Sequence, residues 1–171
     1  MQDDSLIRRA AAQDAAAFEQ LMLLHQKPVY NICWRMAGNA EDALDLSQEV
    51  FLKLWRTLAQ YQFDAAFSTW LYRIAYNTAI SHTRRRRPRT VEINDRQYEL
   101  PDDQEEILFR ETQMEYLEQA LQRLAPDEKA LVELFYLQKI PVHELAAVTG
   151  HTEGSIKVKL FRIRKKLAAL I

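Results

Sequence analysis

Residues 143–160 read His-Glu-Leu-Ala-Ala-Val-Thr-Gly-His-Thr-Glu-Gly-Ser-Ile-Lys-Val-Lys-Leu, and this stretch decides the fold of the C-terminal part of the chain. Ala146 is small at the point where two helices would cross closely, and Gly150 follows where a turn needs a positive φ. Ile156 lies ten residues after Ala146 and would fill the crossing. The spacing predicts a helix-turn-helix whose second helix runs from Thr152 to the C-terminus.

The second helix of this motif separates an apolar stripe from a basic face. Ile156, Leu160, Ile163 and Leu167 recur on the stripe. At 100° per residue, the opposite face and its flanks carry Lys157, Val158, Lys159, Phe161, Arg162, Lys165 and Lys166. Such a face can enter the major groove and contact base edges and phosphates, as many repressors do. An ordinary helical hairpin with a solvated basic end would have the same pattern.

The composition favours helices throughout the chain. Hydrophobic residues make up 48% of the 171 residues, with only 3 Gly and 5 Pro. The sequence has no uninterrupted apolar run of about 18 residues, so we expect no membrane insertion. The acidic start lacks the apolar run of a secretory signal, and the single Cys33 excludes an internal disulfide. We therefore expect a cytoplasmic protein.

The net charge of −1 hides blocks of opposite sign. Residues 84–89 contain five arginines in six positions, and residues 151–171 have a net charge of +5. Residues 90–112 have a net charge of −6. Because charges are screened within about 8 Å at physiological salt, a nucleic acid would respond to the local blocks and not to the total.

The helical periodicity divides the chain into two parts. In the N-terminal part it predicts helices from about Ser5 to Leu24, from Pro28 to Gly38, from Ala40 to Leu58 and from Thr69 to Arg84. Residues 86–106 lack a sustained apolar period. The expected fold is all-α, with two small helical domains, an N-terminal helical bundle and a C-terminal helix-turn-helix. We expect these domains at 1–86 and 108–171, joined by an acidic flexible linker at 87–107.

Two faces of the N-terminal part are candidate binding surfaces. On the third predicted helix, an acidic strip flanked by two aromatics suits a basic partner helix; it comprises Asp42, Asp45, Gln48, Glu49, Phe51 and Trp55. On the fourth, four residues are expected to point away from Trp70 and Ile74, and they suit stacking on an unpaired base: Tyr72, Arg73, Tyr76 and Asn77. Tyr61 in the preceding loop would complete a base pocket, and Arg84 and Arg85 would contact phosphates.

Three stretches together resemble the extracytoplasmic-function group of sigma-70 factors. Residues 38–55 are similar to its core-binding helix, and residues 67–79, from Phe-Ser-Thr-Trp to Asn-Thr-Ala, are similar to its −10 reading helix. Residues 154–162, Gly-Ser-Ile-Lys-Val-Lys-Leu-Phe-Arg, are similar to its −35 reading helix and add Ser155 to the candidate contacts. The resemblance follows the order and spacing of the group over nearly the whole chain.

The resemblance implies the partners and excludes catalysis by the chain alone. It implies docking on core RNA polymerase, at the clamp coiled coil and the flap. It also implies binding of promoter DNA, as duplex at −35 and as a single strand at −10, and inhibition by an anti-sigma factor. No cofactor, metal or catalytic residue is expected.

Two rival functions remain open from the sequence. An enzyme would need a constellation of catalytic groups, but the histidines are scattered and no HExxH spacing, phosphate loop or nucleophile elbow occurs. A stand-alone regulator would bind duplex DNA without polymerase, usually at a palindrome.

Overall fold

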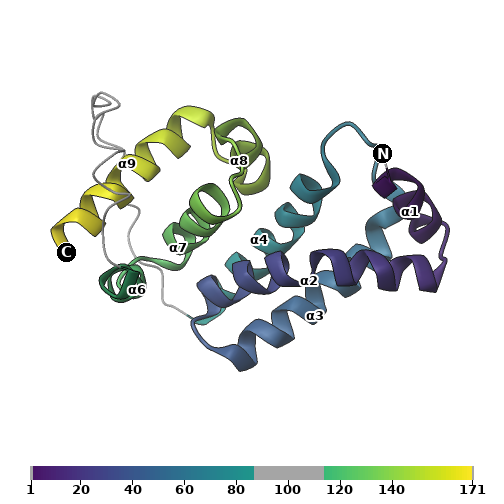
Figure 1. The fold of residues 1–171 in the computed structure, drawn as a ribbon, viewed down its shortest axis with the longest axis horizontal. Helices are drawn as coiled ribbons and strands as arrows, with labels where there is room; N and C mark the ends of the chain where they lie inside the picture. The colour runs from purple at the N-terminus through teal and green to yellow at the C-terminus, as the bar shows by residue number, and fades with distance from the viewer. Residues whose placement is uncertain (1, 87–113, 171) are drawn as a thin grey trace.

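A computed structural model describes residues 2–86 and 114–170, and every regular element among them is a helix (Figure 1). The expected linker lies outside the described residues, as does the start of the expected second domain. We call residues 2–86 the N-terminal lobe and residues 114–170 the C-terminal lobe. The elements are α1 (Gln2–Ala11), α2 (Ala15–Ala37), α3 (Ala40–Thr57), η1 (Leu58–Gln60), α4 (Phe67–Arg86), α6 (Met114–Gln122), α7 (Pro126–Val132), η3 (Glu133–Leu137), α8 (Val142–Thr149) and α9 (Glu153–Leu170).

The N-terminal lobe is a bundle in which α2, α3 and α4 pack against one another and α1 packs on α2. Caps set its helix boundaries. The amide of Ala17 donates to the carboxylate of Asp14 at the start of α2, and the amide of Asp42 donates to Asn39 at the start of α3. Gly38 ends α2 with φ at 80°, a left-handed conformation that favours glycine.

Pro28 lies inside α2, so the prediction that it opens a helix is wrong. The break comes earlier, at residues 12–14, where Gln13 has a φ of 68°. A proline inside a helix leaves the carbonyl four residues before it without its helical donor. Here that residue is Leu24, which lies on the exposed side of α2 with 58% of its surface accessible.

The C-terminal lobe contains the predicted helix-turn-helix as α8 and α9. Helix α7 precedes it and begins at Pro126, whose ring suits the first turn of a helix, and its chain continues directly into η3, a turn of π-helix. Leu131 and Leu134 of this segment are buried. Glu133 is also buried, with 3% of its surface exposed, which the periodicity did not predict.

The two lobes lie side by side in contact (Figure 1). Helices α7 and α8 pack against α4, and α7 and η3 pack against α2. Helix α4 is therefore covered on two sides, by its own lobe and by the C-terminal lobe. This second layer determines which candidate site residues reach the surface.

Candidate nucleic-acid interface

The turn between α8 and α9 has the geometry that the sequence predicts. Gly150 adopts a φ of 78° and its amide donates to the carbonyl of Ala146 at 2.9 Å. Thr152 then caps α9, because its hydroxyl accepts from the amide of Ser155 at 3.2 Å. Ile156 is completely buried. The motif therefore holds α9 in a fixed orientation on the lobe.

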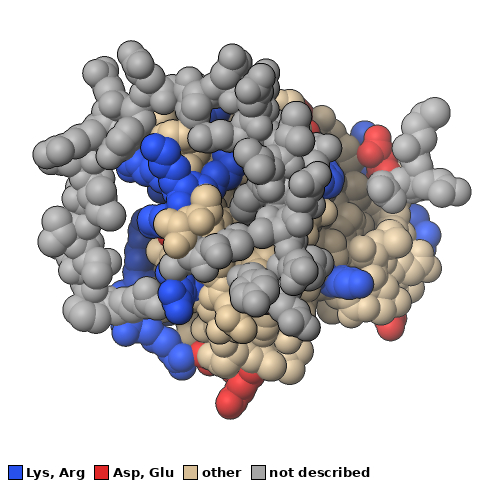
Figure 2. All heavy atoms as spheres, turned by 60° about the vertical axis from the view of Figure 1, so that its left-hand side comes forward, with Lys and Arg blue, Asp and Glu red and all other residues tan. Residues whose placement is uncertain are grey.

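The outward face of α9 is basic. Lys157 and Lys165 are exposed, and Val158 and Arg162 are half-buried. Figure 2 turns the left-hand side of Figure 1, where α9 lies, toward the viewer, and Lys and Arg side chains gather on this face. This arrangement can place cations along a phosphate backbone and one guanidinium near base edges.

Three residues of α9 differ in exposure or pairing from the sequence expectation. The prediction that Phe161 lies on the outer face is wrong, because its side chain is only 4% exposed. The Lys165 ammonium lies 4.8 Å from the centre of its ring. Lys159 lies 3.5 Å from the carboxylate of Asp127, and Lys166 pairs with Glu128. Both acids stand in the first turn of α7. A phosphate would have to compete with them for these two lysines.

On α4, the exposed residues of the predicted base-contacting face are Arg73 and Asn77. Tyr72 and Tyr76 are 7% and 5% exposed, so the prediction that they point outward is wrong for this arrangement of the lobes. The physical reason is the C-terminal lobe that packs on α4. Burial raises the pKa of Tyr76 to about 12, and the carboxylate of Asp127 on α7 adds to this shift.

The loop before α4 forms an aromatic cluster. The rings of Tyr61, Phe63, Phe67 and Trp70 contact one another, with centroids 4.6–6.5 Å apart. Tyr61 is 9% exposed and its hydroxyl donates to the carbonyl of Ala65. The loop is therefore held in shape by its own side chains.

The outward face of α3 combines acids with leucines. Asp45, Gln48 and Glu49 are exposed, and Glu49 pairs with Lys53 at 3.1 Å. Leu44 and Leu52 lie on the same face, and each is 55% exposed. Sequence reasoning missed these leucines, although their spacing of eight residues places them only about 80° apart around a helix, on one side of it.

The aromatic residues expected on this surface have other roles. Phe51 is buried in the core, and the ring of Trp55 packs edge-on against Phe18 with centroids 4.7 Å apart. Asp42 lies at the edge of the face and turns toward the end of α4, where its carboxylate pairs with Arg86. The large apolar side chains exposed on this face of α3 are therefore Leu44 and Leu52.

The arginine run begins at the end of α4. Arg84, Arg85 and Arg86 occupy its last turn and all three are exposed, and the rest of the run lies outside the described residues. Within the described residues, no group of three or more His, Cys, Asp or Glu side chains could hold a metal ion. In the same part of the chain, no helix is long and apolar enough to cross a membrane.

Known proteins share both lobes of this chain. Residues 21–89 match the family described as Sigma-70 region 2, and residues 114–167 match Sigma-70, region 4. The RNA polymerase sigma-H factor of Pseudomonas aeruginosa is 30% identical over 97% of this chain and 92% of its own length. The chain belongs to the sigma-70 family.

The relatives also place this sigma factor in the extracytoplasmic-function (ECF) group. The ECF RNA polymerase sigma-E factor of Escherichia coli is 27% identical over 96% of this chain and 92% of its own length. The fold matches a solved structure of CnrH in complex with the cytosolic domain of CnrY, with a TM-score of 0.70 and 23% identity, covering 99% of this chain and 97% of that one. The all-α fold and the family resemblance expected from the sequence are confirmed.

Proposed function

We propose that this sigma factor docks on core RNA polymerase through α3, reads the −35 element with α9 and reads the melted −10 element with α4. The observation that carries the proposal is the family relationship over both lobes together with a fixed, basic α9. We also propose that the two regions function as separate domains, 1–86 and 108–171, with 87–107 as their connection.

The surface of α3 supports the docking role. Asp45 and Glu49 offer exposed negative charge for a basic partner helix, and Gln48 lies between them. Leu44 and Leu52 add apolar area that a partner can bury. A surface with an apolar centre and charged neighbours is the usual composition of a specific protein interface.

The faces of α9 and α4 support different modes of DNA contact. Arg162 suits a bidentate bond to guanine in the duplex, whereas Lys157 and Lys159 suit phosphates, where a point charge suffices. On α4, Arg73 and Asn77 offer a cation and an amide to a single strand. The proposed −10 contacts also include Tyr61, Tyr72, Tyr76, Arg84 and Arg85.

Chemistry, location and regulation follow from the same proposal. The chain would supply promoter recognition without a catalytic group, because nucleotide addition belongs to the polymerase. Its place of action would be the bacterial cytoplasm. An anti-sigma factor would hold it inactive; a solved relative of the same fold is RpoE in complex with the anti-sigma factor NepR from Bartonella quintana, at a TM-score of 0.67.

A gel-shift comparison tests the proposal against a stand-alone regulator. Promoter duplex is incubated with the chain alone, with core polymerase alone and with both. We expect a stable, heparin-resistant complex only when both are present. Tight binding of the chain alone to a palindromic duplex would identify a stand-alone regulator instead.

A further inference from the structure

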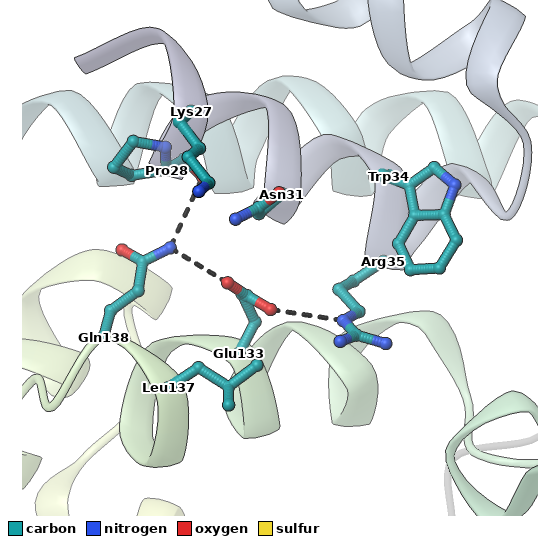
Figure 3. Close-up of a pocket in the computed structure, with 8 residues that line it drawn as sticks. All are labelled: Lys27, Pro28, Asn31, Trp34, Arg35, Glu133, Leu137 and Gln138. Atoms are coloured by element: carbon teal, nitrogen blue, oxygen red, sulfur yellow. Dashed lines mark hydrogen bonds and ion pairs between the residues drawn. The ribbon is translucent and has the colours of Figure 1, made fainter. Parts of the chain in front are cut away.

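Ion pairs join helices of this chain that are far apart in the sequence. Arg35 on α2 pairs with Glu133 on η3 at 3.2 Å and connects the two lobes (Figure 3). Arg86, in the last turn of α4, pairs with Asp42, which stands 44 positions earlier in the first turn of α3. The second pair lies within the N-terminal lobe. It joins the helix proposed for docking to the helix proposed for the −10 element, so it can affect either role.

Donors from two sides surround the Asp42 carboxylate. Both terminal nitrogens of the Arg86 guanidinium donate to it, and the Asn39 side-chain amide donates to it at 2.9 Å. The Asp42 side chain is only 16% exposed, although that of Arg86 is 64% exposed. Asp45, one turn further along α3, is exposed. Within the acidic strip, Asp42 is therefore engaged inside the lobe, whereas Asp45 is accessible to a partner.

His82 approaches the same carboxylate from α4. Its Nε2 atom lies 3.8 Å from Oδ2 of Asp42, is buried and has no hydrogen-bond partner among the described residues. His82 precedes Arg86 by four residues, so both side chains lie on one face of α4. The end of α4 thus presents two side chains to one carboxylate of α3. We call Asp42, His82 and Arg86 the α4 anchor.

The α4 anchor stabilises the last turn of the helix. Helix ends fray more readily than helix interiors, because the last carbonyl groups have no partner within the helix. Arg84 and Arg85 stand in this turn beside Arg86, and three neighbouring guanidinium groups repel one another. The carboxylate of Asp42 offsets part of this repulsion and ties the turn to a second helix. Arg84 and Arg85, which are proposed phosphate contacts, therefore keep a fixed position relative to α3.

We propose that Asp42 is a positioning residue for the −10 strand and not a polymerase contact. Its carboxylate holds the last turn of α4 on α3, so that Arg84 and Arg85 meet the strand at a fixed place relative to the docked polymerase. The inference rests on the proposed functions of α3 and α4. It replaces the docking role expected for Asp42 from the sequence, and Asp45 and its exposed neighbours keep that role.

Hydrogen–deuterium exchange of the free, full-length chain tests the α4 anchor without requiring any activity. Asp42→Asn removes the charge and keeps the size of the side chain. Glu41→Gln is the matched control, because it makes the same change of charge in the same turn of α3 at an exposed side chain. The peptide that covers residues 80–86 should exchange about fivefold faster in Asp42→Asn than in the unaltered chain, with the control unchanged.

A comparison of polymerase binding with promoter melting separates positioning from docking. We expect Asp42→Asn to keep the Kd for core enzyme within about twofold, while at saturating enzyme the −10 thymines become reactive to permanganate about fivefold more slowly. Arg86→Lys keeps a cation for Asp42 and should melt the promoter like the unaltered chain. Arg86→Gln removes the anchoring cation, so adding Asp42→Asn to it should slow melting no further.

Several results would overturn the proposal. A raised Kd for core enzyme with normal melting would return Asp42 to the docking surface. Faster melting in Asp42→Asn would mean that Asp42 merely competes with phosphates for Arg86. Equal exchange rates in Asp42→Asn and Glu41→Gln would show that the carboxylate does not hold the helix end. If the unaltered chain melts no promoter with core enzyme, the proposed function itself is wrong, and the exchange rates alone decide whether the anchor exists.

Discussion

The paired substitution Leu44→Ala/Leu52→Ala removes the apolar part of the proposed docking surface on α3. Each leucine is 55% exposed in the free chain, so about half of its surface remains for a partner to bury. Fully burying a leucine is worth about 1.5–3 kcal/mol, which gives about 1 kcal/mol for each exposed half. The pair should therefore cost about 2 kcal/mol of binding free energy, or about a 30-fold rise in the Kd for core polymerase.

Fluorescence anisotropy of the labelled chain titrated with core enzyme measures this Kd directly. The matched control is Leu23→Ala/Leu24→Ala on α2, where the two leucines are 60% and 58% exposed but lie on another helix. Both variants should keep the thermal unfolding midpoint nearly unchanged, because exposed substitutions have small effects on stability. Equal losses in the two variants, or no loss with Leu44→Ala/Leu52→Ala, would refute the assignment of the α3 face.

Three further predictions concern α4 and α9, which we propose read DNA, and the turn before α9. Burial raises the pKa of Tyr76 to about 12, so as the pH rises the phenol ionises in the unfolded chain before it does in the folded one. The free energy of unfolding should therefore be constant below about pH 10 and fall by about 1.4 kcal/mol per pH unit from there to about pH 12. Urea unfolding of Tyr76→Phe should show a smaller fall in the free energy of unfolding over this range. Arg162→Ala should relax the −35 motif selected from a randomised promoter library, whereas Lys159→Ala should weaken all sequences alike and lower the salt slope by about one ion; the reverse outcome would contradict the orientation of α9. Gly150→Ala should lower the free energy of unfolding by about 1 kcal/mol because φ is 78° there, while Gly154→Ala inside α9 should stabilise the chain slightly, since neither added Cβ meets an atom within 4 Å.

Local signals in the sequence predict the C-terminal motif well. Gly150 is at the turn, Thr152 caps α9 and Ile156 fills the crossing, and each of these follows from backbone conformation or hydrogen bonding within a few residues. The same holds for Gly38 and Asn39 between α2 and α3. Such features depend on neighbours in the chain, which periodicity and capping rules describe directly.

The errors come from contacts between distant parts of the chain. The prediction that Tyr72 and Tyr76 point outward considers the N-terminal lobe alone, in which this side of α4 has no neighbour. In the complete fold α7 and α8 pack against α4 and both tyrosines are buried. Glutamate side chains are mostly exposed, yet Glu133 is buried between the lobes, where it pairs with Arg35 from 98 positions away in the chain. No periodicity within one helix carries this information, because it depends on where the other lobe packs.

On the candidate surface of α3, the exposed acids could be predicted from the sequence, but the exposed apolar residues could not. The acids at Asp45 and Glu49 are exposed as expected, since charged side chains on one helix face rarely become buried. The prediction that Phe51 lies on this surface is wrong, because Phe51 and its neighbour Leu52 point in different directions and it is Phe51 that faces the core. Neighbouring side chains point 100° apart around a helix, so the rotation of α3 in the bundle determines whether Phe51 or Leu52 faces the core.

Run-off transcription with purified core RNA polymerase and a promoter library tests the central claim most directly. The account predicts that adding this chain to core enzyme yields transcripts from a subset of templates that share −35 and −10 sequences at constant spacing. Permanganate should detect unpaired thymines at −10 on those templates only when both proteins are present. Transcripts that match those of core enzyme alone, with no selected motif and no melting, would contradict the account.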